Sequence, residues 1–182
     1  MDRPLLILDI DETLIHGREI PLASPGNFMA GDYHIYLRPH VEEFLLTVYG
    51  AYDLACWSSA SESYLAIIMA ELMPHPELQP VFTWDRRRCT PRLDIANDRF
   101  YFLKNLKKVH RRGYDLRRVL ILEDEPVKVN RHYGNAVYVN PFFGDLDDSE
   151  LPKLSRYLLS IQSMPNFREL EKRNWRTSNA AL

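Results

Sequence analysis

The sequence predicts an α/β fold in which an open sheet of parallel strands carries helices on both faces. Short, continuous apolar runs recur along the chain, as expected of strands that are buried on both faces. Amphipathic helical patterns separate these runs. The chain has 182 residues, 46% of them hydrophobic, which suits one domain with a single substantial core.

The first half of the chain begins with a strand and continues in alternation. Residues 4–9 form a short apolar strand that ends in acid. After a loop rich in proline and glycine, residues 33–39 read as extended chain. A helix follows, because Pro39 suits a first helical turn and apolar residues recur at helical spacing until Gly50. Residues 52–57 form the second predicted buried strand.

The second half repeats this alternation. Ser61 can cap a helix that Pro74 ends. An irregular basic stretch follows the strand predicted next. The remaining predicted elements are a strand at 80–84, a helix at 100–110, strands at 117–122 and 135–139, and an amphipathic helix at 148–161.

Composition and charge predict a soluble intracellular protein, cytoplasmic or, in a eukaryote, nuclear. The net charge of -2 gives no general attraction to nucleic acid or anionic membranes, so we expect neither as a partner. Cys56 and Cys89 are predicted to be reduced thiols rather than a disulfide. Acid appears before a signal-peptide core could form, and no apolar run approaches the roughly 20 residues of a spanning helix. The oligomeric state is left open.

Polar side chains follow three of the predicted strands. In open parallel sheets ligands lie beyond the carboxyl ends of the strands, so these side chains should converge if the strands are neighbours. Clustered carboxylates repel one another, and Mg²⁺, which prefers oxygen ligands, would remove that repulsion. The residues concerned are Asp9, Asp11 and Thr13 after the first strand, Ser58 and Ser59 after the second, and Glu123 and Asp124 after the strand at 117–122.

Each acidic pair also has a structural interpretation. Asp9 and Asp11 could lie in a solvated turn that caps a helix. Glu123 and Asp124 could begin a helix, because acidic residues are common at helix N-termini.

Five stretches together resemble one known family. "LDIDETLIH" resembles the first motif of the haloacid dehalogenase superfamily. More narrowly, it is similar to the small CTD phosphatases, or NLI-interacting-factor-like phosphatases, which act on the carboxy-terminal domain of RNA polymerase II. The other similar stretches are "YLRPHVEEFL", "CWSSAS" for the second motif, "FLKNLKKVHRRGYDLRRVLILEDEP" for the third and fourth, and "NAVYVNPFFGDLDDSELPKL" beyond them.

The resemblance implies a two-step phosphate transfer. Asp9 would attack phosphorus and become an aspartyl phosphate. Asp11 would protonate the leaving oxygen and then activate water. Ser58 and Lys104 would hold phosphate oxygens, while Thr13 would brace the motif loop.

The resemblance also implies a Mg²⁺ cofactor. Asp9, the backbone carbonyl of Asp11, and Asp124 would hold the ion. The fourth motif usually reads Asp-Asp or Asp-Asn, whereas here its first member is Glu123. Glu123 is therefore a candidate metal ligand whose direct or supporting role stays open.

The other candidate site residues also have interpretations without a role in catalysis or binding. Lys104 lies in a lysine- and arginine-rich stretch and could belong to a solvated helix face. Ser58 could be a capping group. Arg86 lies where relatives place a substrate-contacting arginine, but basic runs also occur on plain surface. Ser59, beside Ser58, is the second candidate for substrate binding.

The implied fold is a Rossmann-like sheet of the haloacid dehalogenase type with only small insertions in place of a cap domain. The loop around 15–32 and the basic stretch up to Arg99 are too short for a domain, which rarely folds alone below roughly 40 residues. We therefore expect an open groove, with Tyr33, Tyr36 and Arg86 as candidates for its walls.

The domain is predicted to cover residues 1–163, followed by a polar tail at 164–182 that could be helical or loose. The predicted function is Mg²⁺-dependent phosphomonoester hydrolysis on phosphoserine or phosphothreonine of a protein or peptide. The alternatives are a phosphatase of a small metabolite or a nucleic-acid 3′-phosphate, and a catalytically inactive binding module of the same fold.

Overall fold

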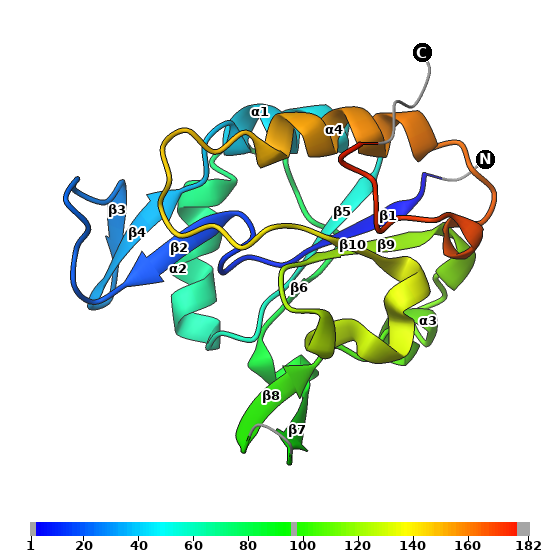
Figure 1. Ribbon diagram of the computed structural model, residues 1–182, viewed down its shortest axis with the longest axis horizontal. Coiled ribbons are helices and arrows are strands. Elements are labelled where there is room, and N and C mark those ends of the chain that lie inside the picture. Colours follow the sequence, from blue (N-terminus) through cyan, green and yellow to red (C-terminus); the bar gives the residue numbers. More distant parts are fainter. Residues whose placement is uncertain (1–2, 96–97, 178–182) are drawn as a thin grey trace.

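A five-stranded sheet forms the centre of the computed structural model, which describes residues 3–95 and 98–177 (Figure 1). The strand order is β10-β9-β1-β5-β6, and every neighbouring pair is parallel. This sheet confirms the predicted fold class and the five strands predicted for it, although the strand predicted at 80–84 is limited to Thr83–Trp84. The strands are β1 (Leu5–Leu8), β5 (Asp53–Trp57), β6 (Thr83–Trp84), β9 (Val119–Glu123) and β10 (Ala136–Tyr138).

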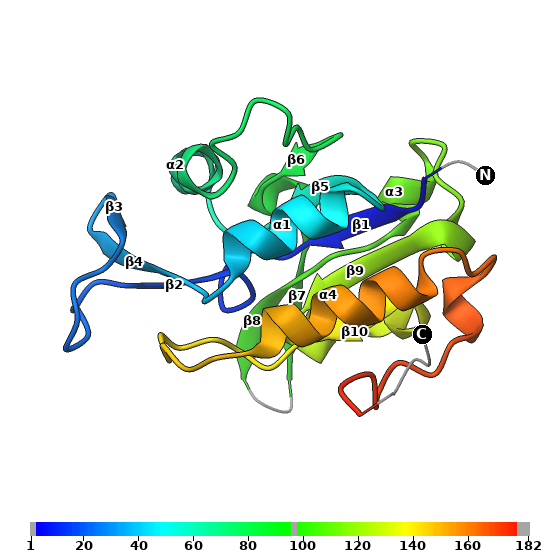
Figure 2. The same cartoon turned by 90° about the horizontal axis from the view of Figure 1, so that it is seen from above.

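Alternate side chains of the central strands enter two different core clusters. Leu6 and Leu8 belong to the larger cluster, while Leu5 and Ile7 belong to the smaller one. On the larger side, α1 and α4 lie next to each other over the sheet (Figure 2). The helices of the larger cluster are α1 (Val41–Tyr49), α2 (Glu62–Leu72) and α4 (Glu150–Ile161), and those of the smaller are α3 (Lys107–His110) and the 3₁₀ segment Pro126–Asn135.

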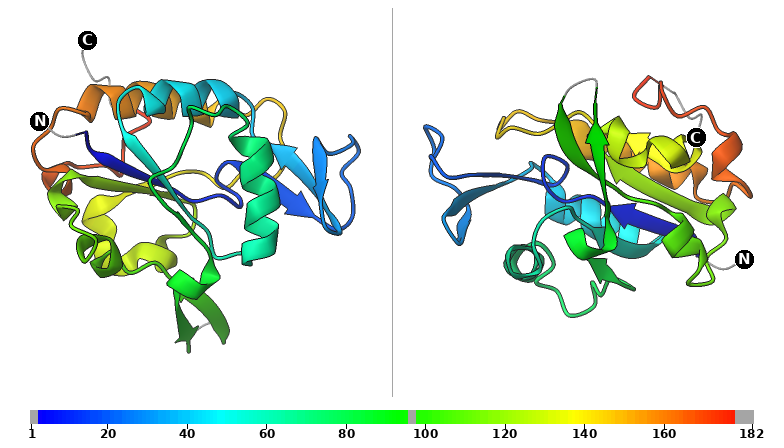
Figure 3. Two further views of the ribbon diagram at one scale, coloured as in Figure 1. Left: turned by 180° about the vertical axis from the view of Figure 1, so that it is seen from behind. Right: turned by 90° about the horizontal axis from the view of Figure 1, so that it is seen from below.

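Two small insertions stand out from this body (Figure 3). Three antiparallel strands in the order β2-β4-β3 follow the first motif, and a β7–β8 hairpin precedes α3. Neither is a cap domain, which confirms the prediction of small insertions. The prediction of a plain loop at 15–32 was wrong, because two strands form there. The bounds are β2 (Ile15–Arg18), β3 (Phe28–Ala30), β4 (Tyr33–Leu37), β7 (Thr90–Asp94) and β8 (Arg99–Leu103).

The helix predicted at 100–110 was also wrong over most of its length. Arg99–Leu103 is strand β8, and it pairs in antiparallel register with Thr90–Asp94. Only Lys107–His110 is helical. Three consecutive aromatic residues have high β propensity, and the partner strand supplies the hydrogen bonds that decide between the two structures.

The described part of the C-terminal tail lies against the body. Phe167, in the 3₁₀ helix Phe167–Glu169, and Trp175 are both buried in the larger core cluster. The Trp175 indole Nε1–H donates to the carbonyl of Tyr138 at the edge of the sheet (2.8 Å). The domain limit at 163 stays a prediction. Among the described residues, none of the helices has the length and apolar character that crossing a bilayer requires.

Candidate active site

Asp9 and Lys104 form a buried ion pair at the carboxyl edge of the sheet. Asp9 follows β1, and its Oδ1 lies 2.6 Å from the Lys104 Nζ. The same Nζ donates to Glu123 Oε2 (2.7 Å) at the end of β9. Asp9 and Glu123 meet because β1 and β9 are parallel neighbours, and Lys104, which follows β8, reaches both of them. Lys104 is fully buried, so the solvated-face alternative is wrong.

Asp9 is held in its ionised form. Burial alone would raise the pKa of this carboxyl, but the charges of Lys104 and Lys128 outweigh that effect and lower it to about 2. Burial and the Asp9 charge raise the pKa of Glu123 and of Asp124. Asp9 is therefore the member of this cluster whose ionised form its surroundings favour most.

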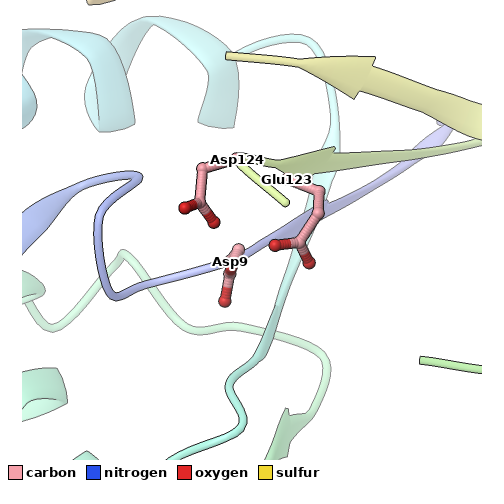
Figure 4. A group of neighbouring side chains, drawn as sticks. All are labelled: Asp9, Glu123 and Asp124. Carbon is pink, nitrogen blue, oxygen red and sulfur yellow. The ribbon is translucent and has the colours of Figure 1, made fainter. Parts of the chain in front are cut away.

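Asp9, Glu123 and Asp124 are suited to hold a cation between them. Their side chains converge (Figure 4), and each offers an oxygen within 4.8 Å of those of the other two. Asp9 Oδ2 and Asp124 Oδ1 are buried and accept no hydrogen bond from the described residues. The Lys128 ammonium lies 3.8 Å from each of these two oxygens, too far for a hydrogen bond, and buried carboxylate oxygens without a hydrogen-bond donor favour a bound cation. The donor set is all oxygen, which fits Mg²⁺.

The Asp11 side chain lies outside this trio. Its carboxylate accepts hydrogen bonds from Ser58 Oγ and from the Tyr64 hydroxyl, both at 3.1 Å. Burial and the Asp9 charge raise its pKa, and these two hydrogen bonds oppose the rise. Asp11 therefore retains a proton more readily than an ordinary aspartate does.

Ser58 is fixed between Asp11 and the turn after β5. Its side chain is fully buried, and Oγ also accepts from the backbone N–H of Ala60 (2.9 Å). Ser58 follows β5, the neighbour of β1, which explains why it reaches Asp11.

An open cavity of about 320 Å³ lies beside Asp11. Arg86 occupies one wall, where its Nε donates to the Ser59 carbonyl (2.6 Å) and its guanidinium lies 4.9 Å from the centre of the Phe102 ring. Tyr33 lines the cavity as predicted, but Tyr36 does not: it is buried, and its hydroxyl donates to the Ser24 carbonyl. The full lining is Asp11, Gly17, Tyr33, Ser59, Ala60, Ser61, Tyr64 and Arg86.

Arg38 holds the loop after β1 through the backbone of Thr13. Its buried guanidinium donates to the Thr13 carbonyl (2.9 Å) and to both oxygens of Asp148 (2.9 and 2.8 Å). Thr13 is fully buried, yet its hydroxyl has no partner among the described residues. The loop is therefore held through the Thr13 backbone, and a bracing role for the hydroxyl stays a prediction.

Sequence reasoning missed two residues of the site. Tyr64 lies in the first turn of α2, three residues after the cap Ser61, a position that directs it back toward the strand ends. Lys128 lies within 4 Å of carboxylate oxygens of Asp9, Glu123 and Asp124. The available signal for Lys128 was a lysine four residues after the acid Asp124.

Comparison with known proteins shows the family to which this chain belongs. A model of the family described as "NLI interacting factor-like phosphatase" matches residues 4–168. The chain belongs to this family. The family match confirms the resemblance seen in the sequence, and it spans every residue of the site.

Relatives of this NLI interacting factor-like phosphatase include two named CTD phosphatases. The zebrafish (Danio rerio) CTD nuclear envelope phosphatase 1B is 29% identical, over 94% of this chain and 72% of that protein. The human carboxy-terminal domain RNA polymerase II polypeptide A small phosphatase 1 is 30% identical, over 84% of this chain but only 57% of that protein.

A solved structure shares the fold. The fission yeast RNA polymerase II CTD phosphatase Fcp1 superposes with a TM-score of 0.60 and 18% identity, over 90% of this chain and 52% of that chain. The relatives in sequence also include a protein of another name. A mitochondrial import inner membrane translocase subunit TIM50 from Phytophthora infestans is 29% identical, over 92% of this chain and 37% of that protein.

Proposed function

We propose that this chain is a Mg²⁺-dependent phosphomonoester hydrolase that acts on phosphoserine or phosphothreonine in proteins. One relationship carries the proposal: an ionised Asp9 lies two residues from an Asp11 of raised pKa, and Asp11 faces an open cavity. A nucleophile and a proton donor with separated pKa values are what two-step phosphate transfer requires.

Asp9 attacks the phosphorus atom, and the bond from phosphorus to the leaving oxygen breaks as the aspartyl phosphate forms. Asp11 gives its proton to that leaving oxygen. In the second step Asp11 takes a proton from water, which attacks the phosphorus and releases phosphate from Asp9. Ser58 and Lys104 stabilise the phosphate oxygens during both steps.

Asp9 and Asp124 would hold a Mg²⁺ ion, whose positive charge would offset repulsion between the nucleophile and the phosphoryl group. The two unpartnered oxygens, Asp9 Oδ2 and Asp124 Oδ1, support this pair as ligands. Participation of the Asp11 carbonyl and a direct role for Glu123 remain part of the proposal.

The preference for a protein substrate rests on the open cavity. An open rim admits a phosphate carried on a chain, and the exposed Arg86 and Tyr33 offer it cationic and aromatic surface. We propose action in a reducing compartment, the cytoplasm or nucleus, because Cys56 and Cys89 are free and buried.

The test is a substrate panel at matched Mg²⁺, with chelator and Asp9→Asn as controls. We expect higher kcat/KM on phosphoserine and phosphothreonine peptides than on sugar phosphates, nucleoside monophosphates or a 3′-phosphorylated oligonucleotide. Chelator should abolish turnover of all of them. A metabolite or oligonucleotide turned over faster than every peptide would overturn the substrate class, and no turnover of any compound would indicate an inactive binding module.

A further inference from the structure

Lys128 is a largely buried cation beside the carboxylate cluster, and the mechanism proposed above gives it no task. It belongs to the 3₁₀ segment Pro126–Asn135, and its side chain is 12% exposed. Its ammonium lies 3.8 Å from Asp9 Oδ2, 3.6 Å from Glu123 Oε1 and 3.8 Å from Asp124 Oδ1.

Two of these contacts involve the unpartnered oxygens of the carboxylate cluster. Asp9 Oδ2 and Asp124 Oδ1 are the atoms best placed to hold a divalent ion, and both lie 3.8 Å from the Lys128 Nζ. That separation is too long for a hydrogen bond but short enough for strong Coulomb attraction in a buried site. The ammonium therefore neutralises the same atoms that the metal would bind.

Glu125 is the fourth partner of the ammonium and the most exposed of the four. Its Oε1 lies 2.9 Å from the Lys128 Nζ, the shortest of the four contacts, and its side chain is 39% exposed. A flexible lysine stem can turn on this outer partner and carry the charge away from Asp9 and Asp124.

We infer that Lys128 is a built-in counter-ion that competes with Mg²⁺ for the Asp9–Glu123–Asp124 cluster and moves toward Glu125 when the ion binds. Lys128 is thus a positioning residue that sets the affinity for metal. It also keeps the carboxylates together when metal is absent. This inference rests on the proposed Mg²⁺ site. Lys128 makes the affinity of that site for Mg²⁺ lower than the carboxylates alone would give, so that binding requires a higher Mg²⁺ concentration.

The test measures Mg²⁺ binding directly, by titration calorimetry on the intact chain without substrate. Lys128→Met keeps the stem and removes the charge, so the Kd for Mg²⁺ should fall by about tenfold or more. Lys153→Met, on the exposed face of α4, removes the same charge elsewhere and should leave the Kd unchanged. Lys128→Arg should keep a Kd close to that of the unmodified protein.

Thermal unfolding gives the second readout. Without metal, Lys128→Met should melt at a lower temperature than the unmodified protein, and Mg²⁺ should raise its melting temperature by a larger amount. If the variant fails to fold without metal, purification in Mg²⁺ followed by chelator titration still yields its affinity.

A double-mutant cycle tests the role of Glu125. Glu125→Gln should weaken Mg²⁺ binding in the unmodified background and lose most of that effect in the Lys128→Met background. Equal effects of Glu125→Gln in both backgrounds would show that Glu125 acts on the metal without Lys128. An unchanged or higher Kd for Mg²⁺ in Lys128→Met would overturn the inference. No Mg²⁺ binding by the unmodified protein would instead count against the proposed function.

Discussion

The Lys104 ammonium lies 2.6 Å from Asp9 Oδ1, and both side chains are buried away from solvent. A lysine with no access to water would normally lose its proton, but here the charges of Asp9 and Glu123 outweigh that desolvation and raise its pKa. The nucleophile of the proposed reaction is therefore also part of the structural core.

The first prediction concerns the stability of this pair. Lys104→Met should destabilise the fold by roughly 3–5 kcal/mol, because it leaves the Asp9 and Glu123 carboxyls buried without their cation. Denaturant unfolding in the presence of chelator measures the change. Lys107→Met, on the exposed surface of α3, is the matched control and should have little effect. Equal stability of the two variants would show that Asp9 does not depend on Lys104.

The second prediction is a pH dependence of stability. The folded pKa of Asp9 is about 2, below its unfolded value of 3.8, so the stabilisation is present above pH 4 and is lost as the pH falls toward 2. Its size is roughly 2 kcal/mol. Asp9→Asn should flatten the fall in unfolding free energy between pH 4 and pH 2, measured without metal. An identical slope in both proteins would contradict the depressed pKa.

The third prediction separates the two aspartates of the motif. Asp9→Asn should abolish turnover and remove any phosphoenzyme trapped by rapid quenching, because an amide is no nucleophile. Asp11→Asn should reduce turnover by about 10²- to 10⁴-fold through lost proton transfer. Intact-mass analysis should still detect phosphorylation of Asp9 in that variant. A phosphoenzyme in Asp9→Asn would place the nucleophile elsewhere.

The sequence could predict the acidic cluster because its geometry follows from strand order. Asp9 and Asp124 follow β1 and β9, and parallel neighbouring strands bring their carboxyl ends together. Lys128 could not be predicted in the same way. It belongs to a 3₁₀ segment with non-helical dihedral angles at Val129, and its position depends on that irregular path.

Two other features could not be predicted because contacts with residues distant in the sequence decide them. The aromatic run before Leu103 satisfies a helical spacing and a strand propensity at once, and only its pairing with Thr90–Asp94 decides between them. Trp175 lies in a polar stretch, and this composition does not predict that its side chain is buried. Its indole N–H nevertheless donates to a backbone carbonyl on β10.

The fourth prediction concerns the wall of the cavity. Arg86→Ala should raise KM for a phosphopeptide by about tenfold, the value of one charge-assisted contact, with a smaller effect on an aryl phosphate. Arg88→Ala is the control, because Arg88 belongs to the same 3₁₀ helix but lies over the Trp84 ring and not in the cavity. Equal changes in KM for both substrates would indicate that Arg86 does not contact the peptide.

The fifth prediction uses the Tyr64 hydroxyl as a probe of Asp11. Its hydrogen bond to Asp11 Oδ1 favours the ionised carboxylate and so lowers the Asp11 pKa. Tyr64→Phe removes that bond, and the pKa of Asp11 should rise. In the variant Asp11 should therefore stay protonated to a higher pH, and the alkaline limb of the kcat profile should move to higher pH.

Tyr33→Phe provides the control for this shift. The Tyr33 ring meets the Tyr64 ring edge-on at a centroid distance of 5.9 Å, and Tyr33 lines the same cavity. The hydroxyls that donate to Asp11 come from Tyr64 and Ser58 among the described residues, so Tyr33→Phe should leave the profile in place. A purely structural role for Tyr64 would lower kcat at every pH without moving the limb, and that result would separate Tyr64 from the proton transfer.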